Sequence, residues 1–155
     1  MAHEFRTEER IAASADDVLA LMIDQETHEA LLAHLGTTVE SIRHDRDGDR
    51  MTTVVTTAEP AMQGATTHRA TLEAIWDLPS RTCTWSRADH TFGDRVKATG
   101  RTEVVADGDR ACKVVESGSI DIKVPVIGKK IGKKVVAAMQ EMAPKKARFW
   151  ADKLR

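Results

Sequence analysis

The sequence lacks any long apolar run. No uninterrupted apolar stretch approaches the roughly 20 residues that a membrane-spanning helix needs. The first residues, Met1 to Arg6, also lack an apolar segment behind a basic start, so we expect no secretory signal. Together these two absences lead us to expect a soluble, cytoplasmic protein.

Cysteine is scarce as well, with Cys83 and Cys112 as the only two in the chain. Each occupies the apolar side of a segment with strand-like alternation. Because structural disulfides are uncommon in the cytoplasm, we predict that both are free thiols that pack as small buried hydrophobic side chains.

Local signatures of common chemistries are also missing. The six histidines show no spacing typical of a metal site, and neither Ser/His/Asp nor Cys/His catalysis has a local signature. Residues 128–132, which contain two glycines, lack the spacing and the following serine or threonine of a phosphate-binding loop. We therefore expect no metal and no cofactor, and no motif assigns a catalytic residue.

The charge is distributed unevenly along the chain. Residues 1–120 carry 13 Lys/Arg and 21 Asp/Glu, whereas residues 121–155 carry 10 Lys/Arg and 3 Asp/Glu. Nucleic acid is a poor candidate partner, because most of the chain is acidic and no binding motif is present.

A length of 155 residues is enough to bury a core, and it predicts a single domain over residues 1–155.

The last thirty residues, 126–155, have the period of one helix face. Apolar side chains recur at mostly three- and four-residue steps, at Ile131, Val135, Met139, Met142, Ala143, Phe149, Trp150 and Leu154. Burying eight such side chains is worth on the order of 12–24 kcal/mol, against a net stability of about 5–15 kcal/mol for a small domain. This helix must therefore belong to the core. Pro144 lacks an N–H group, so we expect a bend over residues 140–144.

Strands and two short helices are predicted before this long helix. A strand over residues 3–13 leads to a helix that Ser14 caps, and a second short helix over residues 30–35 stops at Gly36. Segments with a period of two follow at residues 38–46, 50–57, 67–76, 82–87, 95–105 and 111–124. Short turns join these segments, so we expect an antiparallel sheet. Its single apolar face must be buried against another element of the fold. The fold class is thus α+β, with a curved antiparallel sheet of about seven strands wrapped round the long C-terminal helix.

Two segments resemble a known superfamily. Residues 11–24, Ile-Ala-Ala-Ser-Ala-Asp-Asp-Val-Leu-Ala-Leu-Met-Ile-Asp, resemble the opening of the START-like (SRPBCC) superfamily, an alanine–serine turn into a short helix that ends in aspartate. Residues 124–131, Val-Pro-Val-Ile-Gly-Lys-Lys-Ile, are similar to a mostly actinobacterial branch of unknown function (DUF2505-like), whose last strand runs into a proline–glycine turn. The superfamily includes Bet v 1 allergens, polyketide cyclases/dehydrases, Aha1-type domains and START lipid-transfer domains. The opening helix lacks the tryptophan that many relatives carry there.

The resemblance covers essentially the whole chain. It implies a helix-grip fold with a cavity between sheet and long helix, in which such proteins commonly hold an apolar small molecule. Small residues on the apolar sheet face would leave space there, although they suit close packing equally well: Ala70, Ala74, Ala98, Gly100 and Gly118. Our candidate ligand-binding residues are Met22, His68, Leu72, Trp76, Trp85, Val96, Ala98, Glu116, Met139 and Met142.

Two of these candidates, His68 and Glu116, are ionisable residues on otherwise apolar strand faces. Buried ionisable groups are costly unless paired, and pockets are where they are retained. They would orient the polar end of a ligand, or serve as acid and base in a cyclisation or dehydration. A position at the rim of the sheet, with the side chain in water, is the alternative for each.

Four lysines, Lys129, Lys130, Lys133 and Lys134, occupy the first turns of the long helix, where negative charge is favoured. Lys129 with Lys133, and Lys130 with Lys134, are like-charged pairs four residues apart, which mildly destabilise a helix. A sequence feature that opposes helix stability and brings no evident structural benefit can mark a functional site. We expect either contact with an anion or an anionic membrane surface, or a solvated face that confers solubility.

Three functions remain open. The leading hypothesis is binding or transport of an apolar or amphipathic small molecule, such as a lipid, a polyketide or an aromatic compound, in the cavity. The alternative is an enzyme of the polyketide cyclase/dehydratase type that uses polar cavity residues. A third is a co-chaperone-like interaction module that uses the outer sheet face and needs no cavity. The sequence favours a monomer.

Overall fold

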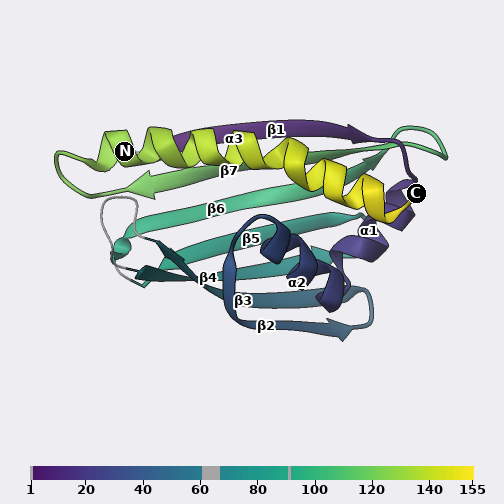
Figure 1. Ribbon diagram of the computed structural model, residues 1–155, viewed down its shortest axis with the longest axis horizontal. Helices are drawn as coiled ribbons and strands as arrows, with labels where there is room; N and C mark the ends of the chain where they lie inside the picture. Colours follow the sequence, from purple (N-terminus) through teal and green to yellow (C-terminus); the bar gives the residue numbers. More distant parts are fainter. Residues whose placement is uncertain (1, 61–66, 91) are drawn as a thin grey trace.

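The computed structural model describes residues 2–60, 67–90 and 92–155 (Figure 1). Seven strands and three helices follow one another along this part of the chain. Their bounds are β1 Ala2–Ile11, α1 Ala15–Met22, α2 Gln25–His34, β2 Thr38–Asp47, β3 Arg50–Pro60, β4 Thr67–Asp77, β5 Thr82–Asp89, β6 Gly93–Ala106, β7 Cys112–Ile122 and α3 Gly128–Lys153.

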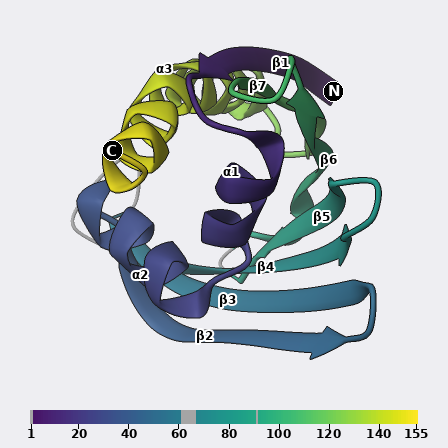
Figure 2. The ribbon, with the colours of Figure 1, turned by 90° about the vertical axis from the view of Figure 1, so that its right-hand side faces the viewer.

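The strands form one antiparallel sheet in the order β1-β7-β6-β5-β4-β3-β2. The sheet bends into a trough, and Figure 2 shows the three helices on its open side. Helix α3 packs mainly along β1 and β7, and α2 packs against β2 at the other edge. This is the helix-grip fold that the sequence predicts, with two short helices between the first two strands.

Side chains cap the two short helices at their N-termini. The Ser14 hydroxyl accepts a hydrogen bond from the Asp17 N–H group at 3.1 Å, and the Asp24 carboxylate accepts one from the Thr27 N–H group at 3.0 Å. Each cap satisfies a backbone donor that has no partner inside the helix. The apolar pattern alone predicts that the second short helix begins at residue 30. Because Asp24 caps it, α2 begins earlier, at Gln25.

Helix α3 is continuous from Gly128 to Lys153 and contains Pro144 in its interior. A proline at this position removes one backbone hydrogen bond and costs about 3 kcal/mol. The neighbouring Ala143 and Ala147 are 5 % and 7 % exposed, and packing of this buried face offsets the loss. The helix therefore continues through the proline without interruption, and the bend over residues 140–144 stays a prediction.

Two hydrophobic clusters make up the core. The larger one joins α1, the sheet and the C-terminal half of α3, and it contains both Trp76 and Trp150. The smaller one lies beneath the N-terminal half of α3, around Phe5 and Ile120. Cys83 and Cys112 are both buried and unbridged, as the sequence predicts.

The residues that the structure describes include no helix that is both long enough and apolar enough to cross a membrane.

Candidate functional site

A cavity of about 290 Å³ lies between the concave sheet face and helices α1, α2 and α3. Most of its wall is apolar, from Phe5, Leu21, Met22, Leu31, Leu32, Leu35, Val55, Leu72, Ala74, Trp76, Trp85, Met139, Met142 and Trp150. Its polar and thiol side chains are His28, Thr37, Thr53, Thr57, Cys83, Arg87, Thr102, Glu116 and Lys146. An apolar wall with a few polar groups is the usual composition of a small-molecule site.

Two glycines lie directly beneath Trp85 and Phe5, two aromatic residues of the cavity wall. Gly100 and Gly118 stand opposite each other on β6 and β7, in the same cross-strand row as Trp85 and Phe5. A Cβ atom on Gly100 would collide with the Trp85 indole, and one on Gly118 would lie 2.8 Å from the Phe5 ring. The two rings stack with centroids 6.1 Å apart. The space that we attributed to these glycines is therefore filled by aromatic rings, which lie flat on the sheet.

Most of the predicted binding residues line the cavity. These are Met22, Leu72, Trp76, Trp85, Glu116, Met139 and Met142. Val96 and Ala98 do not line it, because they pack in the smaller hydrophobic cluster beneath the first half of α3. The side chain of His68 lies outside the part of the chain that the structure describes.

Glu116 faces the cavity and pairs with a lysine that sequence reasoning missed. The Lys146 Nζ donates to Glu116 Oε1 at 2.7 Å, and the two side chains are 22 % and 18 % exposed. Lys146 lies four residues after Met142 and four before Trp150, so helical spacing alone places it on the inner face. The sheet-rim position with the carboxylate in water, our alternative for Glu116, is not what the structure shows.

His28, a second polar group of the wall, is paired with His44, which does not line the cavity. His28 Nδ1 and His44 Nε2 are 2.9 Å apart, and His44 Nδ1 lies 2.8 Å from the Ile23 carbonyl oxygen. Burial, reinforced by the nearby His44 and Lys146 charges, lowers the pKa of His28 from 6.5 to about 4, so the ring is neutral at pH 7. The spacing of the two histidines in the sequence does not reveal this pair, because only the packing of α2 against β2 brings the rings together.

Thr53 is the third polar feature. It lies on β3 directly opposite His44 and is 2 % exposed. Its Oγ1 is buried in the cavity wall and has no hydrogen-bond partner among the described residues. Unsatisfied buried hydroxyl groups are uncommon in native proteins and call for an explanation.

Cys83 also faces the cavity but is a poor nucleophile. Burial, with a smaller contribution from the Glu116 carboxylate, raises the pKa of its thiol to about 12. At neutral pH the thiolate fraction is therefore negligible.

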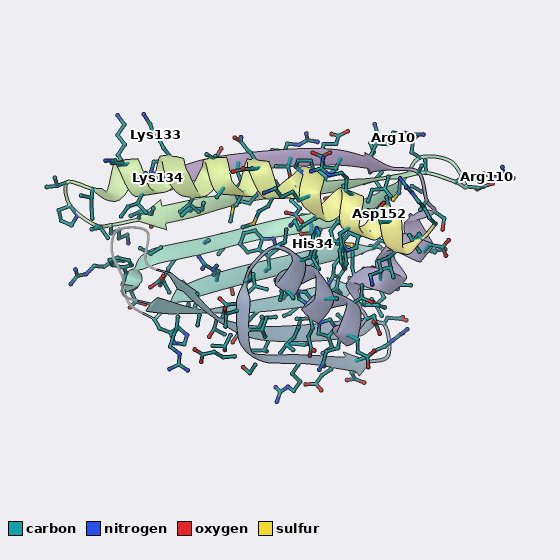
Figure 3. All side chains as sticks on the ribbon, in the orientation of Figure 1. Arg10, His34, Arg110, Lys133, Lys134 and Asp152 are labelled. Carbon is teal, nitrogen blue, oxygen red and sulfur yellow. The ribbon has the colours of Figure 1, made fainter. Side chains whose placement is uncertain are left out.

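A second hollow lies on the outer surface, where the end of α2 approaches the end of α3. It is lined by His34, Lys145, Arg148, Phe149, Asp152 and Lys153. Figure 3 labels two of these side chains, His34 and Asp152. Its volume is about 490 Å³, but most of its lining side chains are exposed and charged. No polar group is buried there, so we place the candidate site in the inner cavity.

The four lysines at the start of α3, Lys129, Lys130, Lys133 and Lys134, are all exposed. Figure 3 labels Lys133 and Lys134 at the end of α3 remote from the C-terminus. The preceding turn exposes Val126 fully and Ile127 at 37 %. Val126 also has a positive φ of 71°, which is unfavourable for a β-branched residue.

A family profile described as "Protein of unknown function (DUF2505)" matches residues 6–154. The chain belongs to this family. The match includes all of the fold except the first four residues of β1, and it agrees with the resemblance carried by residues 124–131. A search of curated proteins found no match to this DUF2505 chain.

Several solved structures share the fold. The Zhui aromatase/cyclase from Streptomyces sp. R1128 superposes with a TM-score of 0.70 at 12 % identity, over 100 % of this chain and 97 % of that one. A START superfamily protein from Mycobacterium smegmatis gives 0.65 at 18 % identity, over 99 % of both chains. The protein TTHA0849 from Thermus thermophilus gives 0.68 at 24 % identity, over 97 % of this chain and 95 % of that one. At these identities the likeness establishes the START-like fold alone.

Proposed function

We propose that this protein binds an apolar or amphipathic small molecule, such as a lipid, a polyketide or an aromatic compound, in the cavity beneath α3. The observation that carries the proposal is the cavity itself: an apolar chamber of about 290 Å³ with polar groups at a few points of its wall. That volume is just below the range of about 300–1,000 Å³ for ligand pockets. A compound of one or two rings, or a short acyl chain, suits it better than a two-tailed lipid.

The proposal is tested by ligand-observed NMR with a library of aromatic compounds and short fatty acids, alongside a variant whose cavity is filled. Ala74 lines the cavity and is 6 % exposed, so Ala74→Leu adds a larger side chain to the chamber. The same substitution at the exposed Ala20 on α1 is the matched control. We expect binding by the wild type and by Ala20→Leu, and weakened binding by Ala74→Leu. If no library member binds, or if all three proteins bind equally, the cavity is not a ligand site.

An enzymatic role of the cyclase or dehydratase type is the second candidate. The Glu116–Lys146 pair at the cavity favours it, because a carboxylate and an ammonium within hydrogen-bond distance can exchange a proton with a bound substrate. The structural likeness to an aromatase/cyclase is consistent with this chemistry. Incubation with an unreduced poly-β-keto thioester, followed by mass spectrometry, tests it. A product mixture identical with and without protein would reject the enzymatic role.

We also propose that the start of α3 contacts an anionic membrane surface while the ligand is loaded. Four exposed lysines follow the fully exposed Val126 and the 37 % exposed Ile127 in the chain, so positive charge and apolar surface occur together. Each lysine near such a surface contributes about 1 kcal/mol. Co-sedimentation with vesicles containing phosphatidylserine should exceed that with phosphatidylcholine alone and should fall with salt. A variant with all four lysines changed to glutamine should lose the difference. Equal sedimentation of both proteins would exclude this contact.

A further inference from the structure

One end of the cavity wall carries polar atoms that no described residue satisfies. Thr53 and His28 both line the cavity. His44 links their positions, because it is the cross-strand partner of Thr53 in the β2–β3 register and its Nε2 lies 2.9 Å from His28 Nδ1. This group of three, the Thr53–His28–His44 cluster, lies between α2 and the sheet. The remaining wall around it is largely apolar.

When both rings are neutral, the hydrogen-bond chain fixes their tautomers. A carbonyl oxygen can only accept, so the contact with the Ile23 oxygen requires a hydrogen on His44 Nδ1. Neutral His44 then has a bare Nε2, and His28 must donate to it from Nδ1. The proton of neutral His28 is therefore committed to Nδ1, and its Nε2 holds a lone pair. None of the residues that the structure describes donates a hydrogen bond to that nitrogen.

Thr53 provides the complementary group. Its hydroxyl is buried in the same wall, lacks a partner among the described residues, and can donate one hydrogen bond. The cluster thus combines an unused acceptor, His28 Nε2, with an unused donor, Thr53 Oγ1–H. A carbonyl or ether oxygen of a ligand could satisfy only the threonine, and a carboxylate could not donate to the imidazole. A neutral hydroxyl group can donate to one and accept from the other.

We propose that the cavity binds a hydroxylated apolar compound, a phenol or an alcohol, whose hydroxyl group donates to His28 Nε2 and accepts from Thr53 Oγ1. The inference rests on the proposed binding function and adds the functional group that the ligand carries. His44 takes no direct part and acts as a positioning residue, because its bond to the Ile23 carbonyl oxygen holds His28 in the accepting tautomer. Lys146, whose charge acts on His28, also disfavours protonation of that imidazole.

A matched set of probes separates the hydroxyl preference from apolar binding. The probes are naphthalene, 2-methoxynaphthalene, which accepts a hydrogen bond but cannot donate one, and 2-naphthol, which does both. Dissociation constants come from ¹⁵N–¹H chemical-shift titrations at pH 7.5. Because a buried polar group left unpaired is expensive, we expect 2-naphthol to bind about tenfold or more tightly than either analogue.

Two variants identify the cluster as the source of the preference. His28→Phe and Thr53→Val should each reduce the advantage of 2-naphthol severalfold while naphthalene still binds. Thr52→Val is the matched control, because Thr52 is the neighbour of Thr53 on the opposite face of β3, and this variant should keep the wild-type preference. In long-range ¹H–¹⁵N spectra, free His28 should show a bare Nε2, and that resonance should move when 2-naphthol is added but not when naphthalene is added.

The outcomes separate this inference from the proposed function. If all three probes bind with equal affinity, the cavity is a ligand site but the hydroxyl subsite is wrong, and a water molecule satisfies Thr53. The same conclusion holds if His28 carries its proton on Nε2. If none of the probes binds, and no member of the aromatic and fatty-acid library binds either, both proposals fail together.

Discussion

Glu116 on β7 and Lys146 on α3 are joined by a hydrogen bond of 2.7 Å, so the long helix is fixed to the sheet by a charged contact inside the cavity wall. Each side chain is less than a quarter exposed. Removing one partner leaves a partly buried charge without its counterpart, whereas removing both leaves neither. The pair therefore adds a charged contact to the apolar packing of Ala147 and Trp150 that holds the second half of α3 above the cavity.

This contact predicts non-additive stability changes. Glu116→Gln and Lys146→Met should each destabilise the protein by about 1–3 kcal/mol, and the double variant should be less destabilised than the sum of the two. Urea denaturation of the four proteins in a double-mutant cycle measures the coupling. Lys145→Met, at the exposed neighbouring position, should change stability by no more than about 0.5 kcal/mol. Strict additivity of the two single variants would show that the pair contributes nothing.

The free energy of unfolding should decrease as the pH is lowered from 6.5 to 4, because of His28. Burial and the charges of its neighbours lower the pKa of this histidine to about 4. Above pH 6.5 neither folded nor unfolded chains carry this proton, so stability is complete. Below pH 6.5, His28 binds a proton in the unfolded chain, but in the folded protein it does not do so until about pH 4. The total loss is on the order of 3 kcal/mol.

Urea denaturation at a series of pH values measures this loss. The His28→Phe variant should give a flatter profile than the wild type over the same pH range. His34→Gln, an exposed change at the end of the same helix, serves as the control and should keep the wild-type slope. An equally steep profile for His28→Phe would assign the effect to other groups.

Gly100→Ala should destabilise the protein by about 1–3 kcal/mol, because the added Cβ would collide with the Trp85 indole and lie 2.5 Å from the Ser117 carbonyl oxygen. Thr99→Ala, at the exposed neighbouring position, should have little effect. Thermal unfolding followed by circular dichroism measures both. An unchanged melting temperature for Gly100→Ala would mean that the rings do not lie on this glycine.

The two cysteines should resist alkylation in the folded protein. Burial raises the pKa of Cys112, and burial together with the Glu116 carboxylate raises that of Cys83 to about 12. The reactive thiolate is therefore scarce at pH 8, and both sulfur atoms are shielded. Mass spectrometry after treatment with iodoacetamide should show modification only when urea is added. Rapid labelling of Cys83 in the native protein would mean that reagents enter the cavity and that the thiol is ionised there.

Periodicity predicted the architecture well, because one long apolar helix face and alternating strands specify which surfaces must meet. Its limits are seen at β2. A bulge between Val39 and Ser41 shifts the pairing with β3, so simple alternation along this strand does not give the side on which His44 lies. The partner of His44 comes from α2, and only the tertiary packing of α2 on β2 places the two rings together.

The candidate site was predictable in part. Apolar residues such as Leu72 and Trp76 follow from strand alternation, and Thr53 could have been found in the same way, as a hydroxyl between the apolar Met51 and Val55. The shape of the cavity could not be predicted. Small residues on the sheet indicate space, but the rotamers of Trp85 and Phe5 decide whether that space is filled. These rings cover the glycine row and form part of the wall of the cavity.

The two edges of the sheet are β1 and β2, which are separated in the chain only by α1 and α2. Ala2 at the start of β1 pairs with Asp121 at the end of β7. During translation, β1 therefore has no strand to pair with until β7 has been made, and β7 ends at residue 122 of 155. Until then the unpaired backbone of β1 is exposed, and chaperone protection during translation would matter most for this segment.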